Sequence, residues 1–159
     1  MKISFVCQGN IIRSPLAENM FQHLVNEQGL SGKYQLDSSG TSAYHSGEAP
    51  DMRMRQVAAK HGFEYTGQAK QFRREDLNIN DLIIVMDQNN HRIIRSMAQD
   101  EAQSKKIHMM REFDPQGSGE LDVPDPYYGG TEGFEVTYQI VKRSCEGLLE
   151  VLESDLFTP

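Results

Sequence analysis

The stretch that decides the fold lies at the start of the chain and reads Lys2-Ile3-Ser4-Phe5-Val6-Cys7-Gln8-Gly9-Asn10-Ile11-Ile12-Arg13-Ser14-Pro15. Its first residues, 2–6, are typical of a short buried strand. A loop with Gly9 and Asn10 follows. Ser14 as N-cap, with Pro15 at the first helical position, then predicts the start of a helix. Strand, loop and helix in this order indicate an α/β domain.

Strands and helices are predicted to alternate along the rest of the chain. Residues 82–86 form a continuous apolar run, as in a central parallel strand covered on both faces. Apolar periodicity and stop signals predict further strands at 34–38 and 106–110, and helices from 14 to about 29 and at about 51–61, 88–98 and 131–153. No repeat or linker divides the sequence, so we expect one doubly wound domain over residues 1–159, with its ligand site at the carboxyl ends of the strands.

Composition limits the class of protein. The 159 residues include 38% hydrophobic and 25% charged ones, as in a soluble globular domain. No apolar run approaches the ~18 residues of a membrane span, and no signal peptide is recognisable, so we expect a cytoplasmic protein. The formal charge of −7 argues against a nucleic-acid partner, which would require a dense basic patch.

Metal, cofactor and disulfide chemistry is not indicated. Cys7 and Cys145 have no ligand spacing around them. Five histidines show no metal-ligand pattern and are assigned no catalytic role: His23, His45, His61, His91 and His108. We therefore expect no cofactor, no metal, and a Cys145 that is structural.

Cys7 and Arg13 are separated by five residues, which allows the intervening loop to surround one phosphate group. Backbone N–H groups and the positive end of the following helix can bind the anion, and Gly9 permits the necessary backbone angles. Arg13 can bind two phosphoryl oxygens in fork geometry. These positive surroundings favour a thiolate on Cys7, with Ser14 placed to donate a hydrogen bond to it. The alternative is that Cys7 is a small buried hydrophobe.

A thiolate that attacks phosphorus requires a general acid for the leaving group. Asp125 is the best candidate, since the prolines on both sides fix its backbone. Tyr127 and Tyr128 can form the wall of a groove for an aromatic ring. The alternative for this segment is a surface turn, because Asp-Pro and Gly-Gly are themselves turn signals.

The sequence resembles the low-molecular-weight protein tyrosine phosphatase family over nearly its whole length. The resemblance is carried by residues 7–18, 37–42, 47–51, 86–87 and 122–130, with Phe134. It implies a flavodoxin-like fold with four parallel strands in the order 2-1-3-4. It also implies that Cys7 is the nucleophile, that Arg13 binds phosphate and that Asp125 is the general acid. The remaining loop residues, Gln8, Gly9, Asn10, Ile11, Ile12 and Ser14, would contact the phosphate or shape the loop, supported by Ser38.

Several positions depart from the family pattern or refine it. Many members carry a second cysteine where this chain has Ile12. Ile12 therefore removes the thiol that can form a disulfide with an oxidised nucleophile. Members that prefer phosphoarginine usually have threonine in place of Ile11, so Ile11 favours phosphotyrosine. Tyr44 takes the place of an aromatic on the groove wall. The family often has a histidine near the position of Gly67 that supports the loop asparagine; glycine cannot do this, so Asn10 must be held in another way.

The predicted activity is hydrolysis of phosphotyrosine and small aryl phosphates through a cysteinyl-phosphate intermediate. We expect proteins that contain phosphotyrosine as partners. Phosphate or vanadate should bind as competitive ligands, and the protein should be a monomer. The alternatives are a phosphoarginine phosphatase and a non-catalytic module that binds phosphate or phosphopeptides. An arsenate reductase would need additional cysteines, and a flavin-binding module rests on the fold alone.

Overall fold

A four-stranded parallel sheet forms the centre of the computed structural model, which describes residues 1–154. The strands are β1 (Lys2–Cys7), β2 (Gln35–Gly40), β3 (Leu82–Val85) and β4 (Ile107–Met109), in the order β2-β1-β3-β4. The predicted order is confirmed, with strand ends displaced by one or two residues. The last five residues of the predicted domain, 155–159, lie outside the described residues.

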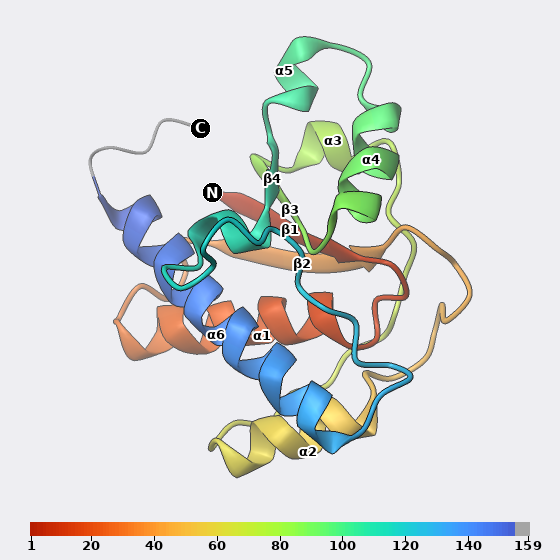
Figure 1. The fold of residues 1–159 in the computed structure, drawn as a ribbon. Coiled ribbons are helices and arrows are strands. Elements are labelled where there is room, and N and C mark those ends of the chain that lie inside the picture. Colours follow the sequence, from red (N-terminus) through yellow and green to blue (C-terminus); the bar gives the residue numbers. More distant parts are fainter. Residues whose placement is uncertain (155–159) are drawn as a thin grey trace.

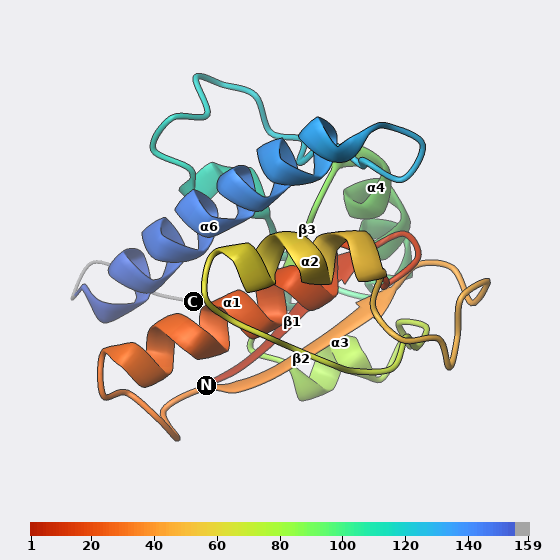
Figure 2. The same ribbon diagram turned by 90° about the horizontal axis from the view of Figure 1, so that it is seen from below.

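Helices cover both faces of the sheet (Figures 1 and 2). One layer contains α1 (Arg13–Glu27), α2 (Met52–Lys60) and α6 (Thr131–Glu153), and the opposite side carries α3 (Asp76–Ile79), α4 (Gln88–Met97) and α5 (Glu101–Ser104). A 3-10 helix, η1 (Met110–Phe113), follows β4. The sequence pattern does not indicate α3, α5 or η1, because four residues are too few to show a helical period.

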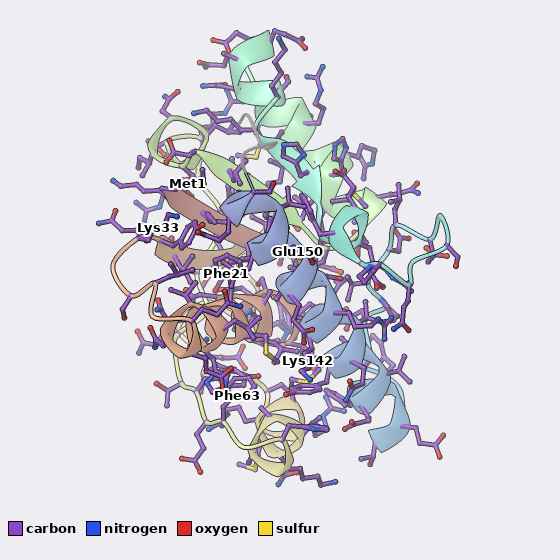
Figure 3. All side chains as sticks on the ribbon, turned by 90° about the vertical axis from the view of Figure 1, so that its left-hand side faces the viewer. Met1, Phe21, Lys33, Phe63, Lys142 and Glu150 are labelled. Atoms are coloured by element: carbon purple, nitrogen blue, oxygen red, sulfur yellow. The ribbon has the colours of Figure 1, made fainter. Side chains whose placement is uncertain are left out.

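Side chains of β1 alternate between two hydrophobic cores, as the period of a strand requires. Ile3, Phe5 and Cys7 belong to the core under α1 and α6, whereas Val6 belongs to the core shared with α4. Phe21 of α1 is fully buried against this sheet face, as Figure 3 shows. Cys7 thus ends a rigid, doubly covered strand.

The register of the strands brings three chain segments to one edge of the sheet. Cys7 is paired with Gly40 of β2, and Val6 with Val85 of β3. The segments that leave β1, β2 and β3 therefore begin side by side at the carboxyl edge, where open parallel sheets bind ligands. None of the helices in residues 1–154 is long and apolar enough to cross a membrane.

Candidate active site

The loop between β1 and α1 turns its carbonyl groups away from the pocket. The carbonyl oxygens of Cys7, Gln8 and Ile11 accept hydrogen bonds from the N–H groups of Thr41 (2.9 Å), Ser42 (3.0 Å) and Asp51 (2.7 Å). Because a trans peptide holds the next N–H opposite the carbonyl, the amides after these carbonyls point the other way. The loop therefore presents N–H donors to the pocket that its residues line.

The Cys7 sulfur receives hydrogen-bond partners from the loop itself. Sγ lies 3.1 Å from Oγ of Ser14 and 3.3 Å from the backbone nitrogen of Asn10. Ser14 is not the N-cap that the sequence predicts: α1 begins at Arg13, and Ile12 takes the cap position without a side-chain bond. The Ser14 hydroxyl is engaged with the Cys7 sulfur and with the carbonyl of Ser39 instead.

The Asn10 side chain ties the loop to the segments packed on the side away from the pocket. Its Oδ1 accepts from the N–H of Lys70 (3.0 Å), and its Nδ2 donates to Oγ of Ser14 (2.8 Å) and of Ser38 (3.1 Å). Lys70 N–H is therefore the contact that supports Asn10 in a chain with glycine at position 67. Gly40 permits the close approach of β2, since a Cβ there would come within 2.5 Å of the Gln8 carbonyl oxygen.

Arg13 is buried and held in position by three groups. Its Nη1 donates to Oδ2 of Asp87 (2.7 Å) and to the carbonyl of Val123 (3.0 Å), and its Nη2 lies 3.5 Å from Oδ2 of Asp125. Burial works to lower the pKa of Arg13, but the negative charges of Cys7, Asp87 and Asp125 together raise it. The guanidinium is thus a fixed positive charge beside the sulfur.

Asp125 follows two residues that are anchored by hydrogen bonds, one to the residue after β3 and the other to α6. The N–H of Val123 donates to the carbonyl of Met86 (2.8 Å), and Thr137 of α6 donates to the carbonyl of Pro124 (3.1 Å). The N–H of Tyr127 donates to Oδ1 of Asp125 (3.1 Å). Since its side chain is 42% exposed, the carboxyl group can exchange protons with solvent.

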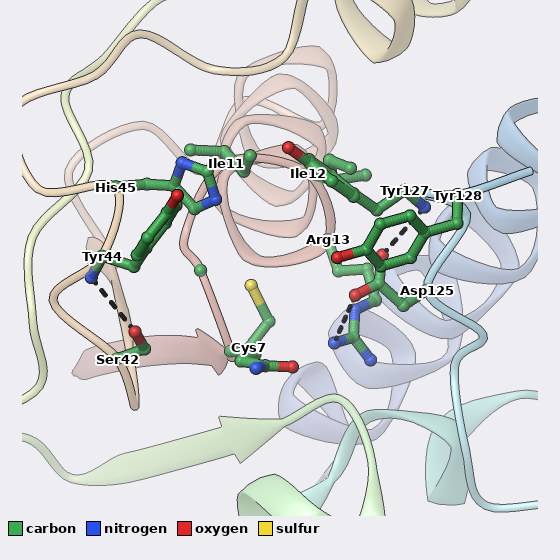
Figure 4. Close-up of a pocket in the computed structure, with 12 residues that line it drawn as sticks. Cys7, Ile11, Ile12, Arg13, Ser42, Tyr44, His45, Asp125, Tyr127 and Tyr128 are labelled. Atoms are coloured by element: carbon green, nitrogen blue, oxygen red, sulfur yellow. Dashed lines mark hydrogen bonds and ion pairs between the residues drawn. The ribbon is translucent and has the colours of Figure 1, made fainter.

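These groups surround one pocket with a volume of about 400 Å³. Cys7 lies at its base, and Asp125, Tyr128, Tyr44 and His45 surround it (Figure 4). The full lining consists of Cys7, Gln8, Gly9, Ile11, Ile12, Arg13, Ser42, Tyr44, His45, Asp125, Tyr127 and Tyr128. A thiol, a buried guanidinium and loop amides at the base, with a carboxyl group and aromatic rings above, suit a phosphorylated aromatic group.

A sequence profile described as "Low molecular weight phosphotyrosine protein phosphatase" matches residues 2–157. The chain belongs to this family. A low molecular weight protein-tyrosine-phosphatase of Streptomyces coelicolor is 38% identical, with 98% of this chain and 95% of the relative covered. A protein tyrosine phosphatase structure from Entamoeba histolytica, with Hepes in the active site, has a TM-score of 0.91 at 37% identity over 96% of this chain and 97% of that one.

An arginine phosphatase of drosophila is also structurally similar to the chain. It has a TM-score of 0.89 at 30% identity and covers 98% of this chain and 99% of that chain. The fold is therefore shared with proteins that are named tyrosine phosphatase and arginine phosphatase.

The structure brings the predicted site residues of this family member together in two layers. The Asn10 side chain lies on the far side of the loop from the pocket and donates to Ser14 and Ser38. The other predicted residues, apart from Ser14 and Ser38, line the pocket itself. The flavodoxin-like architecture implied by the resemblance is confirmed.

The sequence analysis gives no role to three residues that the structure places at the site. Asp87 binds Arg13 and also caps α4. Its position directly after a central strand could have indicated a site residue. His45 lines the pocket, and Lys70 holds Asn10 through its backbone N–H. A backbone N–H is present in every residue except proline, so the type of residue at position 70 does not indicate this contact.

Proposed function

We propose that this chain hydrolyses phosphotyrosine through a covalent cysteinyl-phosphate on Cys7. In the first step the thiolate attacks phosphorus in line, the P–S bond forms, and the P–O bond to the tyrosine breaks. Ser14 and the Asn10 N–H, at 3.1 and 3.3 Å from the sulfur, stabilise the thiolate and later the leaving sulfur. In the second step water attacks phosphorus and the P–S bond breaks.

Asp125 is the proton carrier in both steps. It protonates the departing phenolate in the first step and takes a proton from the attacking water in the second. Its position beside Arg13, at 3.5 Å, places the carboxyl group at the edge of the phosphate site. Tyr127 N–H donates to Oδ1 and Oδ2 faces Nη2 of Arg13, so these two contacts set the orientation of the carboxyl group.

Arg13 and the loop amides would bind the equatorial phosphoryl oxygens. The charge on these oxygens persists through both transition states, and fixed donors that need no rearrangement stabilise it best. Asp87 and the Val123 carbonyl hold Nη1 of Arg13, which directs the other guanidinium N–H groups toward the pocket. Free phosphate or vanadate would occupy the same donors as a competitive ligand.

The observation that carries the proposal is the position of Asp125 and the tyrosines above Cys7. Three aromatic side chains surround the pocket, those of Tyr44, Tyr127 and Tyr128. This arrangement suits a phenyl ring. Ile11 adds an apolar side chain to the same lining, which favours an aromatic leaving group over a charged guanidinium. Phosphoarginine hydrolysis is therefore the second candidate.

The test is phosphate release from a phosphotyrosine peptide at about pH 5 to 7 in the presence of EDTA, with phosphoarginine and phosphoserine peptides as competitors. We expect turnover on phosphotyrosine that vanishes in Cys7→Ser and persists in Cys145→Ser, the matched control for a buried thiol. Phosphopeptide binding without turnover of any substrate would favour the non-catalytic module, and preferred turnover of phosphoarginine would favour the second candidate.

We also propose that the protein works as a monomer in the reducing cytoplasm. A nucleophilic thiol must stay reduced to act, and Cys7 and Cys145 are both free thiols. Sedimentation and cell fractionation would test this location and state.

A further inference from the structure

His45 packs directly against the phosphate loop although no catalytic step above uses it. It lies between β2 and α2 and lines the pocket. A Cβ built on Gly9 would come to 3.0 Å from Cδ2 of His45, so glycine at position 9 makes room for the imidazole. The side chain is only 16% exposed, which identifies His45 as a part of the pocket wall and not a loose surface residue.

Glu48 determines the orientation of this ring. Nδ1 of His45 lies 2.6 Å from Oε2 of Glu48. The Glu48 N–H donates to the carbonyl of His45 (2.9 Å), and its carbonyl accepts from Ala69 N–H (2.8 Å). Since Nδ1 faces Glu48, Nε2 is the ring nitrogen turned toward the pocket (Figure 4). With a hydrogen on each ring nitrogen, Nδ1–H is donated to Glu48 and Nε2–H is a free donor toward the pocket.

The groups that face His45 are the carboxylate of Glu48 and two tyrosines. The ring centroid of Tyr44 lies 4.8 Å away and that of Tyr127 6.0 Å away. Arg53 lies behind Tyr127, with its guanidinium 5.4 Å from the tyrosine ring. Arg53 is paired with Asp51 at 2.9 Å, so its charge is neutralised by a neighbour.

The two sides of the pocket mouth differ in charge. His45 lies on one side of Cys7 and Asp125 on the other (Figure 4). Arg13 is 3% exposed and paired with Asp87 and Asp125, so its charge acts at the base. A substrate residue next to the phosphotyrosine therefore meets an imidazole on one side and a carboxyl group on the other.

We propose that His45, oriented by Glu48, is a specificity-determining residue that binds the carboxylate of an acidic residue adjacent to phosphotyrosine. The inference rests on the proposed function and names the substrate class of that site. Nε2–H of the imidazolium donates a charge-assisted hydrogen bond to the substrate carboxylate.

The test compares two phosphotyrosine peptides that differ only in glutamate or glutamine on both sides of the phosphotyrosine. The measured quantity is the ratio of their kcat/KM values, which does not depend on the fraction of folded enzyme. The matched control is His23→Gln, because His23 pairs with Glu27 at 3.1 Å on α1, outside the pocket lining.

At low salt and about pH 6 we expect the wild type to prefer the glutamate peptide by about two- to fivefold. His45→Gln should bring the ratio to about one, while His23→Gln should keep the wild-type ratio.

A wild-type ratio of one, or the same ratio in His45→Gln, would overturn the inference. If His45→Gln lowered kcat/KM equally for both peptides, the ratio would stay unchanged, and His45 would act only as a part of the pocket wall. Turnover of the glutamine peptide separates the two proposals: turnover without discrimination overturns this inference alone, and no turnover of either peptide overturns the proposed function together with it.

Discussion

The backbone N–H of Lys70 donates a hydrogen bond of 3.0 Å to Oδ1 of Asn10 and so ties the phosphate loop to the segment that follows α2. Asn10 also has a φ of 56°, in the left-handed region that asparagine and glycine adopt more readily than other residues. Its Nδ2 donates to Ser14 and Ser38. Asn10 thus shapes the loop through both its backbone and its side chain.

Asn10→Ala should weaken the fold and the catalysis together. It leaves Ser14, Ser38 and the Lys70 N–H without their shared partner and forces alanine into the left-handed region. We expect the free energy of unfolding to fall by about 2 to 4 kcal/mol and kcat to fall as the Ser14 hydroxyl loses its fixed position. Urea denaturation and steady-state kinetics measure both quantities.

Asn10→Gly is the matched variant, because glycine accepts the backbone angle and lacks only the side chain. It should retain about 1 kcal/mol more stability than Asn10→Ala. Equal stability of the wild type and both variants would contradict this role of Asn10.

The sequence predicts the strands from local patterns, and it names candidate reacting groups that the structure brings to one pocket. The apolar run at 82–86 predicts a central strand, and the spacing of Cys7 and Arg13 predicts the anion loop. The role of Ser14 was wrong in one respect: a serine before proline resembles an N-cap, but its hydroxyl is engaged with the Cys7 sulfur. His45 joins the site only through loop packing, which no local pattern encodes, whereas the place of Asp87 after a central strand is a signal that the sequence does contain.

Asp114 should be a principal anchor of the segment that carries Asp125. Its buried carboxylate accepts from Arg111 (3.1 Å) and Arg143 (3.0 Å), and Arg111 also donates to the carbonyl of Asp122 (3.1 Å). Burial works to raise the pKa of Asp114, but the hydrogen bonds from Arg143, from the N–H of Gln116 and from Arg111 hold it below its usual range. The stability that it contributes is therefore present above the unfolded-state pKa of about 4.

Asp114→Asn should lower the free energy of unfolding by about 3 kcal/mol at neutral pH, because two arginines lose a buried counter-charge. The difference from wild type should begin to shrink as the pH falls below about 4, where the unfolded chain takes up the proton, and should vanish below the lowered pKa of the folded Asp114 carboxylate. The control is Glu146→Gln, whose exposed pair with Lys142 at 3.6 Å should contribute less than about 1 kcal/mol. Similar effects of the two substitutions would contradict the anchor role.

Glu18 of α1 should make the protein less stable as the pH rises through neutrality. Burial and the nearby charge of Asp37 raise its pKa to about 7. Because the folded protein binds this proton more tightly than the unfolded chain does, stability falls between about pH 4.5 and 7, by at most about 3 kcal/mol. Glu18→Gln should remove this dependence and be the more stable protein above about pH 7.

Urea denaturation at several pH values measures the effect, with the exposed Glu64→Gln as control. If the free energy of unfolding changed with pH in the same way in the wild type and in Glu18→Gln, the pKa of Glu18 would not be raised in the folded protein.

Oxidation of Cys7 should be poorly reversible in this chain. Peroxide converts the thiolate to a sulfenic acid, which a neighbouring thiol can capture as a disulfide with release of water. Ile12 lines the pocket beside Cys7 in place of such a thiol. Cys145, the other cysteine, is fully buried on α6 with its S–H directed to the carbonyl of Ala17. Further oxidation to the sulfinic acid is then the remaining route.

Ile12→Cys should introduce the missing partner. After the same exposure to peroxide, we expect a thiol reductant to restore a larger fraction of activity in Ile12→Cys than in the wild type. Mass spectrometry should detect a disulfide between Cys7 and the introduced thiol in place of the sulfinic acid. Ile12→Val controls for the change in side-chain volume and should behave like the wild type. Rapid and complete recovery of the wild-type enzyme would show that the pocket protects the sulfenic acid without a second thiol.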